Sequence, residues 1–464
     1  MAAAGLAAAA SLSACTITPL PSSKPAKKAP AVKIDTDPYP STYARYPGVP
    51  TLIRNVTILD GEGGRIERGW VSLAEGEISG IGAGTLEASP GTVVIDGTGK
   101  TVTPGIIDVH SHLGDYPSPG VDAHSDGNEA TSPSRPVVWA EHSVWPQDPG
   151  FSRALTNGGV TALQILPGSA NLFGGRSVVL KNVQARTVQG MKFPGAPYGL
   201  KMACGENPKR VYGGKGGPGT RMGNIAVTRA TWLKARDYKR KWDKYERTGG
   251  EMPTRDLAME TLRGVLAGDI IVHNHCYRAD EMAIMIDLSK EMGYKIGAFH
   301  HAVEAYKIAD LLAANGICGA LWADWYGFKM ESYDAVSENI PLVHSAGACT
   351  IVHSDDANGI QRLNQEAAKA LAAGRRIGIN VSDAVAWTWL SSNPAKALGI
   401  FDQTGSLKVG KMADVVLWNG DPFSVYTRPD KVWIDGALLY DSANPALRPV
   451  SDFELGQPGE GDVK

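Results

Sequence analysis

Apolar runs alternate with stretches of helical periodicity between residues 106 and 390. Short runs rich in β-branched and aliphatic residues are typical of buried strands, and a period near 3.6 is typical of helices packed on a sheet. This alternation predicts parallel strands joined by crossover helices. The expected strands are residues 106–110, 161–166, 199–203, 270–275, 295–300, 316–321 and 349–353, with an eighth expected between 166 and 269. The expected helices include residues 255–267, 279–292, 302–314, 364–373 and 381–390.

The two ends of the chain show a different pattern, in which short strands are separated by tight turns. Such strands are expected at residues 51–59, 70–73, 78–81 and 93–96, and again at 410–418 and 432–440. We expect both ends to pair into one small domain. The predicted fold is an α/β chain with a (β/α)8 TIM-like barrel and a small β-sandwich domain. The sandwich is assigned to residues 49–103 and 405–445, the barrel to 104–404, and a tail to 446–464.

The start of the chain has the character of an export leader. Residues 2–10 are an apolar run that is too short to span a bilayer. The following Leu12-Ser-Ala-Cys15 resembles a bacterial lipoprotein cleavage box. The pattern predicts a signal peptide over residues 1–15, a lipid anchor at Cys15, and a location in the periplasm or at the outer membrane. Residues 16–48 are rich in Pro, Ser and Lys and predict an extended, disordered tether.

Composition narrows the choice of partners. The 464 residues carry a formal net charge of −2, which gives no reason to expect nucleic acid. One segment, residues 228–247, is basic and amphipathic. We interpret it as a solvated helix, and the alternative is a contact with a polyanion or lipid. The four cysteines after the leader, Cys204, Cys276, Cys318 and Cys349, fit no metal motif. We expect buried free thiols, although pairing in an oxidising compartment stays open.

Histidines and acids follow several of the predicted strands. His110 and His112 close the first strand, and a period of two points both imidazoles to the same side. Further pairs close later strands, and the last expected strand runs into His353-Ser-Asp-Asp356. Barrel enzymes carry their chemistry at the C-terminal ends of the strands, so these side chains are expected to meet. Only ten histidines occur in the chain, which makes chance clustering a poor explanation.

These motifs resemble the amidohydrolase superfamily over about residues 50–440. The resemblance includes the lead-in at residues 97–112 and the closing segment at 405–418, and it is nearest to the imidazolonepropionase-like and prolidase-like branches. It implies a metal-dependent hydrolase on a (β/α)8 barrel. It also implies ligands from the first, fifth, sixth and eighth strands: His110, His112, His275, His301 and Asp355. His273 is the alternative on the fifth strand, and His300 on the sixth.

The number of metal ions depends on a bridging ligand from the third or fourth strand. The resemblance allows either a glutamate or a carboxylated lysine there, and both residue types occur in Leu200-Lys-Met-Ala-Cys-Gly-Glu206. We favour Glu206 and keep Lys201 as the alternative. The expected cofactor is one or two divalent metal ions, most plausibly Zn²⁺ because imidazoles dominate the ligands.

The expected reaction is cleavage of a C–N amide bond by activated water, with Asp355 as the general base and then the general acid. Candidate substrates are cyclic amides, dipeptides and N-acyl amino acids. The expected substrate contacts lie on loops after the strands: Lys209, Arg210, Tyr212, Trp325 and Lys329. The alternatives are a deaminase, a carbamate hydrolase, or a ligand-binding lipoprotein without catalysis. The sequence leaves open whether the chain forms a homo-oligomer.

Overall fold

Apolar segments of the chain form two eight-stranded sheets in the structure, a computed structural model that describes Met1 and residues 33–447. The first sheet takes its strands from both chain ends. They are β1 (Thr51–Leu59), β2 (Arg65–Ala74), β3 (Glu77–Ala83), β4 (Val93–Asp96), β5 (Thr101–Pro104), β14 (Val415–Trp418), β15 (Pro429–Ile434) and β16 (Ala437–Asp441). The ends join where β5 pairs antiparallel with β14, in the register Val102 with Leu417. The prediction of one small domain built from both ends is therefore confirmed.

The second sheet is the barrel, and its strands are neighbours in sequence order. They are β6 (Ile106–Ser111), β7 (Val160–Ile165), β8 (Phe173–Lys181), β9 (Gly199–Ala203), β10 (Ile271–Cys276), β11 (Ile296–His301), β12 (Cys318–Leu321) and β13 (Thr350–Val352). The barrel is nearly closed, because the Asp355 N–H just after β13 donates to the His110 carbonyl at the end of β6, at 2.9 Å. This confirms the predicted barrel class.

Strand β8 corrects the expectation that every barrel strand is parallel. It supplies the missing eighth strand, but it pairs antiparallel with both β7 and β9. All nine of its residues are buried, although the sequence contains Gly174, Gly175, Arg176 and Lys181. Those polar and small residues hid the strand from a search for apolar runs. Lys181 is tolerated in the interior because its ammonium lies 2.9 Å from an Asp435 carboxylate oxygen.

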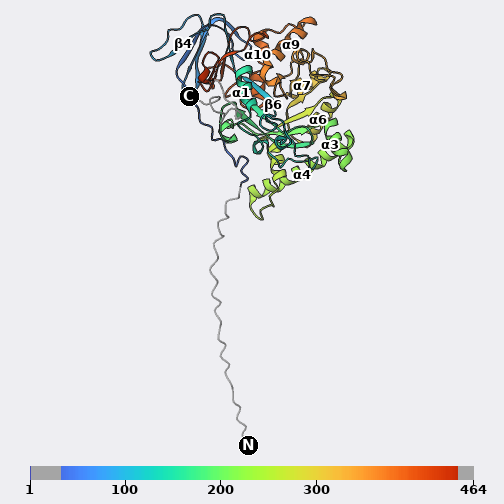
Figure 1. Cartoon of the computed structure of the whole chain (residues 1–464). Helices are drawn as coiled ribbons and strands as arrows, with labels where there is room; N and C mark the ends of the chain where they lie inside the picture. Colours follow the sequence, from blue (N-terminus) through green and yellow to red (C-terminus); the bar gives the residue numbers. More distant parts are fainter. Residues whose placement is uncertain (2–32, 448–464) are drawn as a thin grey trace.

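Helices surround the barrel, as Figure 1 shows. The α-helices are α1 (Pro149–Gly158), α2 (Val188–Met191), α3 (Glu206–Tyr212), α4 (Arg221–Thr248), α5 (Leu257–Ala267), α6 (Ala279–Met292), α7 (Ala309–Asn315), α8 (Asn339–Ser345), α9 (Leu363–Arg376), α10 (Asp383–Trp387) and α11 (Ser392–Ala397). Short 3-10 helices are η1 (Asp122–His124), η2 (Ala140–His142), η3 (Gly213–Lys215), η4 (Ala305–Ile308), η5 (Met330–Ser332), η6 (Gly359–Arg362) and η7 (Pro445–Leu447). The helix expected over 302–314 is thus divided between η4 and α7.

Local sequence signals explain where the best-predicted helices begin and end. Asp256 caps α5 by accepting from the backbone N–H groups of Ala258 and Met259. Helix α6 carries two acids in its first turn, which suits the positive end of the helix dipole. It ends at Gly293, whose φ of 82° is the left-handed conformation typical of a glycine after a helix. Its observed bounds coincide with the expected 279–292.

The first described segment lies against the barrel. The carbonyl of Thr36 accepts from Arg176, and the Asp37 carboxylate lies 2.7 Å from the Lys192 ammonium. Further on, the Tyr43 hydroxyl donates to Asp435. The predicted disordered tether, residues 16–48, therefore extends too far toward the C-terminus, because residues from Thr36 onward contact the barrel. Cys15, the predicted signal peptide beyond Met1 and most of the predicted tail lie outside the described residues. Within the described part of the chain, no helix has the length and apolar character needed to cross a membrane.

Candidate active site

The candidate active site lies at the C-terminal ends of the parallel barrel strands. His110 lies near the end of β6, and His112 directly follows that strand. His275 is the second-last residue of β10, and His301 is the last residue of β11. His353 and Asp355 come directly after β13. The two six-residue strands β10 and β11 are in register, with Cys276 opposite His301, so their ends meet at one rim. The fold therefore brings side chains from distant parts of the sequence to one place.

Two overlapping groups of donor atoms have the geometry of a metal site. His110, His112 and Asp355 form one group and His110, His301 and His353 the other; within each, the donor atoms lie within 4.8 Å of one another. One Asp355 carboxylate oxygen lies 3.1 Å from Nε2 of both His110 and His112. Imidazole nitrogens with a carboxylate are the donor set that zinc and similar divalent ions prefer.

Buried atoms without partners indicate that this cluster is built for a ligand. The Nδ1 atoms of His275, His301 and His353 are buried, and none has a hydrogen-bond partner among residues 33–447. A buried polar atom without a partner costs about 1–3 kcal/mol. Three such atoms are expensive to bury, and a bound cation would remove that cost. The residues present therefore fit a metal centre.

Burial keeps the imidazoles in the form that binds metal. It lowers the pKa of His110, His275 and His301 well below the ordinary value, and that of His353 to about 3. These side chains are neutral near pH 7, so their lone pairs are available. Burial alone raises the pKa of Asp355, but the surrounding histidines, His301 and His112 first, outweigh burial and hold it below the usual value. Asp355 is therefore ionised.

The backbone at two of these positions is strained. His301 has φ of 68° and Asp355 has φ of 64°, in the left-handed region that residues other than glycine rarely adopt. Such conformations persist where the surrounding structure holds them, and they concentrate at functional sites. Here they turn the two side chains toward the histidine cluster at the strand ends.

The two candidates for a bridging ligand lie in different surroundings. Lys201 lies in β9 with 1% of its surface exposed, and its Nζ is 3.2 Å from His110 Nε2. Burial lowers its pKa to about 7. Glu206 begins α3, where its carboxylate lies 3.6 Å from the Lys329 ammonium and its backbone N–H donates to Glu331. The structure thus places Lys201, and not Glu206, inside the cluster.

The alternative histidines form a second row behind the cluster. His300 Nδ1 lies 2.8 Å from His110 Nδ1, and His300 Nε2 lies 2.9 Å from His273 Nδ1. These contacts occupy the inner nitrogen of His110 and leave its Nε2 facing Asp355. Outer partners of this kind fix the orientation of a ligating imidazole. Strand alternation predicts that His300 faces away from His301, but the ring centres of both lie 4.8 Å from that of His110.

Aromatic side chains cover the cluster on one side. Tyr277 stacks on His301 with ring centres 5.3 Å apart, and Trp322 lies 4.3 Å from the same imidazole. Trp325, an expected substrate contact, stacks on Trp322 at 5.0 Å. Lys329, also expected there, places its ammonium 3.9 Å from the centre of the Tyr277 ring. The lysine and the aromatic wall therefore border the same site.

The other expected substrate residues lie in α3. Lys209 and Arg210 make no hydrogen bond or ion pair with the histidine cluster among the residues that the structure describes. Tyr212 is buried, and its hydroxyl has no partner within residues 33–447. The sequence reasoning also left His353 and Tyr277 out of the site. His353 could have been found by the rule that selected the others, because it is the last residue of the predicted strand 349–353.

Two disulfides correct the expectation of free thiols. Cys204 pairs with Cys276, and Cys318 pairs with Cys349, with Cα atoms 5.2 and 4.4 Å apart. Each bond joins neighbouring barrel strands that are far apart in sequence, which is why spacing alone did not reveal the pairing. The first bond ties the end of β9 to Cys276, the residue after His275. It therefore fixes one wall of the candidate site.

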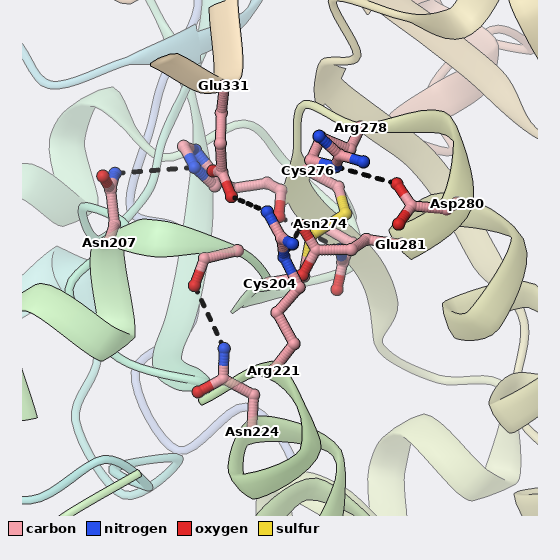
Figure 2. The surroundings of a disulfide bond; sticks show 12 residues. Cys204, Asn207, Arg221, Asn224, Asn274, Cys276, Arg278, Asp280, Glu281 and Glu331 are labelled. Atoms are coloured by element: carbon pink, nitrogen blue, oxygen red, sulfur yellow. Dashed lines mark hydrogen bonds and ion pairs between the residues drawn. A yellow bond between two sulfur atoms is a disulfide. The ribbon is translucent and has the colours of Figure 1, made fainter. Parts of the chain in front are cut away.

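Figure 2 shows how charged side chains surround the first disulfide. Arg221 lies between two acids, 3.1 Å from Glu281 and 3.3 Å from Glu331. Glu331 in turn accepts from the backbone N–H of Glu206 at 3.0 Å. This network holds the start of α3, and with it Asn207, whose amide nitrogen lies 3.5 Å from His275 Nε2.

The barrel and its histidine–aspartate cluster define the class of the protein, a TIM-like barrel with a candidate metal centre at the strand ends. Residues 252–439 match the Amidohydrolase family. An amidohydrolase from Thermotoga maritima is 35% identical with a TM-score of 0.77, and the match covers 84% of this chain and 100% of that one. The chain belongs to the amidohydrolase family. Its relatives include hydrolases that act on C–N bonds in varied small molecules.

Two further similarities are informative in different ways. Amidohydrolase tasK of Hapsidospora irregularis is 32% identical over 88% of this chain, but the chain spans only 45% of that protein. The chain thus covers less than half the length of this relative. An adenosine deaminase from Xanthomonas campestris, with bound zinc, is 16% identical with a TM-score of 0.51, over 87% of this chain and 94% of that one. At that identity the similarity concerns the fold alone.

Proposed function

We propose that the protein is a metal-dependent amidohydrolase that cleaves a C–N amide bond in a small molecule. The observation that carries the proposal is the position of Asp355, whose carboxylate lies 3.1 Å from Nε2 of His110 and of His112 and 3.9 Å from the buried Nδ1 of His301. The cyclic amides, dipeptides and N-acyl amino acids expected from the sequence remain the proposed substrate classes.

One or two divalent ions are proposed to bind here, and Zn²⁺ is the expected metal. The proposed ligands are His110, His112, His275, His301, Asp355 and Lys201. Lys201 takes the place that the sequence had assigned to Glu206, since only the lysine lies in the cluster. His353 lies within the same group of donor atoms and is a further candidate. When bound, such ions lower the pKa of water and polarise a carbonyl group.

Asp355 is proposed as the group that moves the proton. Its carboxylate is ionised, 25% of its side chain is exposed, and it lies at the rim of the cluster where water and substrate arrive. It accepts a proton from the attacking water and delivers it to the leaving nitrogen. A positioned base of this kind contributes about 10²–10⁴ to the rate.

Lys329 is proposed to recognise a negatively charged group on the substrate. Its side chain is only 19% exposed, it lies against Tyr277, and its ammonium is 3.1 Å from the Asn207 amide oxygen. Trp325 extends the wall on the same side through Trp322. A dipeptide or an N-acyl amino acid carries a carboxylate that suits this lysine. Lys209, Arg210 and Tyr212 have no such contact with the cluster.

We also propose that the protein is exported and anchored through lipid at Cys15. The two disulfides support export, because such bonds persist in oxidising compartments and are rare in the cytosol. The apolar leader and the cleavage box support the anchor. Export of a Cys15→Ser variant that still carries lipid would contradict it.

The proposed function is tested by Asp355→Asn with Asp356→Asn as the matched control. Asp356 is the adjacent acid, but its carboxylate accepts from the backbone N–H groups of Asn358 and Gly359 and lies outside the cluster. We expect Asp355→Asn to lower kcat by at least about a hundredfold and the control to retain activity. Equal activity in both variants would remove Asp355 as the base.

A further inference from the structure

Positive charge is concentrated on α4. The 28 residues of this helix include nine lysines and arginines and three acids, in a chain whose formal net charge is −2. Ion pairs use part of that charge. Lys239 lies against Asp243, and Arg240 and Lys241 both lie against Asp237. Arg221 and Arg229 pair with acids of other segments. Lys244 and Arg247 form no ion pair among the residues that the structure describes. The C-terminal half of α4 therefore carries a surplus of cations.

These cations face one cavity, called here the basic cavity. It has a volume of about 470 Å³ and lies where α4 meets the ends of α5 and α6. Its lining comprises Arg236, Lys239, Arg240, Lys244 and Arg247, with Asp243, Leu266, Met292 and Gly293. The carbonyl of Glu291, near the end of α6, accepts from Arg236 and orients that side chain. Five cations and one acid around a single opening suit an anionic group such as a phosphate.

Apolar side chains also belong to the basic cavity, because Leu266 and Met292 are part of its lining. Met252, in the connection that follows α4, is 49% exposed, and Leu257, the first residue of α5, is 58% exposed. Cations beside exposed apolar side chains are typical of surfaces that lie on anionic membranes. The aromatic residues of α4 cannot serve as stacking platforms for bases, because Trp232, Tyr238 and Trp242 are buried. A lipid surface is therefore a better match than nucleic acid.

The basic cavity lies at the end of the barrel opposite the candidate active site. Met292 and Gly293 precede β11, which begins at Ile296, whereas His301 ends the same strand at the active site. The first described segment arrives at this opposite end too. Asp37 accepts a hydrogen bond from Tyr198, the residue directly before β9. Figure 1 shows α4 protruding at the end of the molecule away from β4.

We propose that the basic cavity, with the apolar side chains of its lining, docks on anionic lipid headgroups, so that the candidate active site opens away from the membrane. The proposal is independent of the proposed catalytic function. An anchor attached before residue 33 would leave the basic cavity next to the bilayer, because the first described residues lie at the same end of the barrel. The docking surface would then fix the orientation of the barrel on the membrane.

The test uses the full chain with Cys15→Ser, so that no acyl group contributes to binding. Co-sedimentation is measured with vesicles of phosphatidylcholine alone and with vesicles containing 30% phosphatidylglycerol, at about 0.1 M salt, where charges act over about 10 Å. We expect binding only to the anionic vesicles. Changing Arg236, Arg240, Lys244 and Arg247 together to Gln should lower the partition coefficient at least about tenfold, because cations near such a surface are attracted to anionic lipids.

The matched control changes four exposed cations elsewhere to Gln: Arg65, Arg375, Arg376 and Lys408. Figure 1 places α9 and α10, near these residues, at the other end of the molecule from α4. We expect this variant to bind like the parent, and circular dichroism to show that both variants are folded. Equal loss in both variants, or equal binding to neutral vesicles, would overturn the proposal. Binding to heparin or duplex DNA without binding to anionic vesicles would overturn it as well.

Discussion

Replacing Lys201 with methionine tests how the metal centre is completed. The change removes a buried amine 3.2 Å from His110 Nε2 and keeps an unbranched apolar stem of similar length. Methionine fits irregular core space well, so the fold is expected to survive. If the Lys201 amine takes up carbon dioxide, releases a proton and bridges two ions as a carbamate, its loss should reduce bound metal from about two equivalents toward one.

The size of the effect follows from the position of the amine. Replacing a residue that only hydrogen-bonds to a metal ligand usually lowers metal affinity by about 10–100-fold. Replacing a ligand itself should lower it by at least as much. With a folded pKa of about 7, Lys201 is mostly neutral at pH 8 and mostly charged at pH 6. Protonation adds positive charge beside the metal ligands. We therefore expect metal retention by the unaltered protein to fall as the pH drops through 7, and this dependence to weaken in Lys201→Met.

The assay is elemental analysis of zinc per chain after dialysis at pH 6 and pH 8. Glu206→Gln is the matched control, because its carboxylate faces Lys329 and not the histidine cluster. The control is expected to keep its metal. Full metal content in Lys201→Met, together with the loss of one equivalent in Glu206→Gln, would refute the reasoning and restore the glutamate as the bridge.

Three other predictions concern stability and the cluster. The double variant Cys204→Ser, Cys276→Ser should have a free energy of unfolding about 2–4 kcal/mol lower, because the bond closes a separation of 72 residues. Denaturant titration would detect this loss, and an unchanged midpoint would contradict a structural role. Burial and the nearby Glu331 raise the folded pKa of Glu281 to about 7, so its contribution is full below pH 4.5 and is lost as the pH rises through 7. Glu281→Gln should flatten this part of a thermal-stability profile, and a profile unchanged by the variant would count against the shift. His353→Ala should weaken zinc binding by at least about tenfold in a competition titration with a chelator, whereas equal affinity would exclude it from the ligand set.

The sequence was sufficient to predict the barrel and the end of the barrel at which the candidate site lies. Apolar runs marked seven barrel strands, and histidines at their ends marked the site. Strand β8 escaped because its interior positions include Arg176 and Lys181, which are buried through specific partners such as the Asp435 carboxylate. The periodicity of apolar residues cannot identify a buried strand that contains charged side chains. It also cannot show that such a strand runs antiparallel to its neighbours.

The finer details of the site required the fold. Lys201 and Glu206 are five residues apart, and only the register of β9 against β10 places the lysine opposite His273 and inside the barrel. The disulfides were hidden for the same reason, because each joins strands that are neighbours in space but distant in sequence. His353 was visible as a strand-end residue, but the presence of Asp355 two positions later drew the assignment away from it.

The most direct test of the central claim is a substrate screen on the zinc-loaded protein before and after chelation. Cyclic amides, dipeptides and N-acyl amino acids are incubated with the protein, and both the released amine and free ammonia are measured. The account predicts metal-dependent formation of a carboxylate from at least one class, with release of an amine from a dipeptide or an N-acyl amino acid and ring opening of a cyclic amide. Ammonia as the only product would identify a deaminase instead, and turnover that persists unchanged after complete removal of metal would contradict the account.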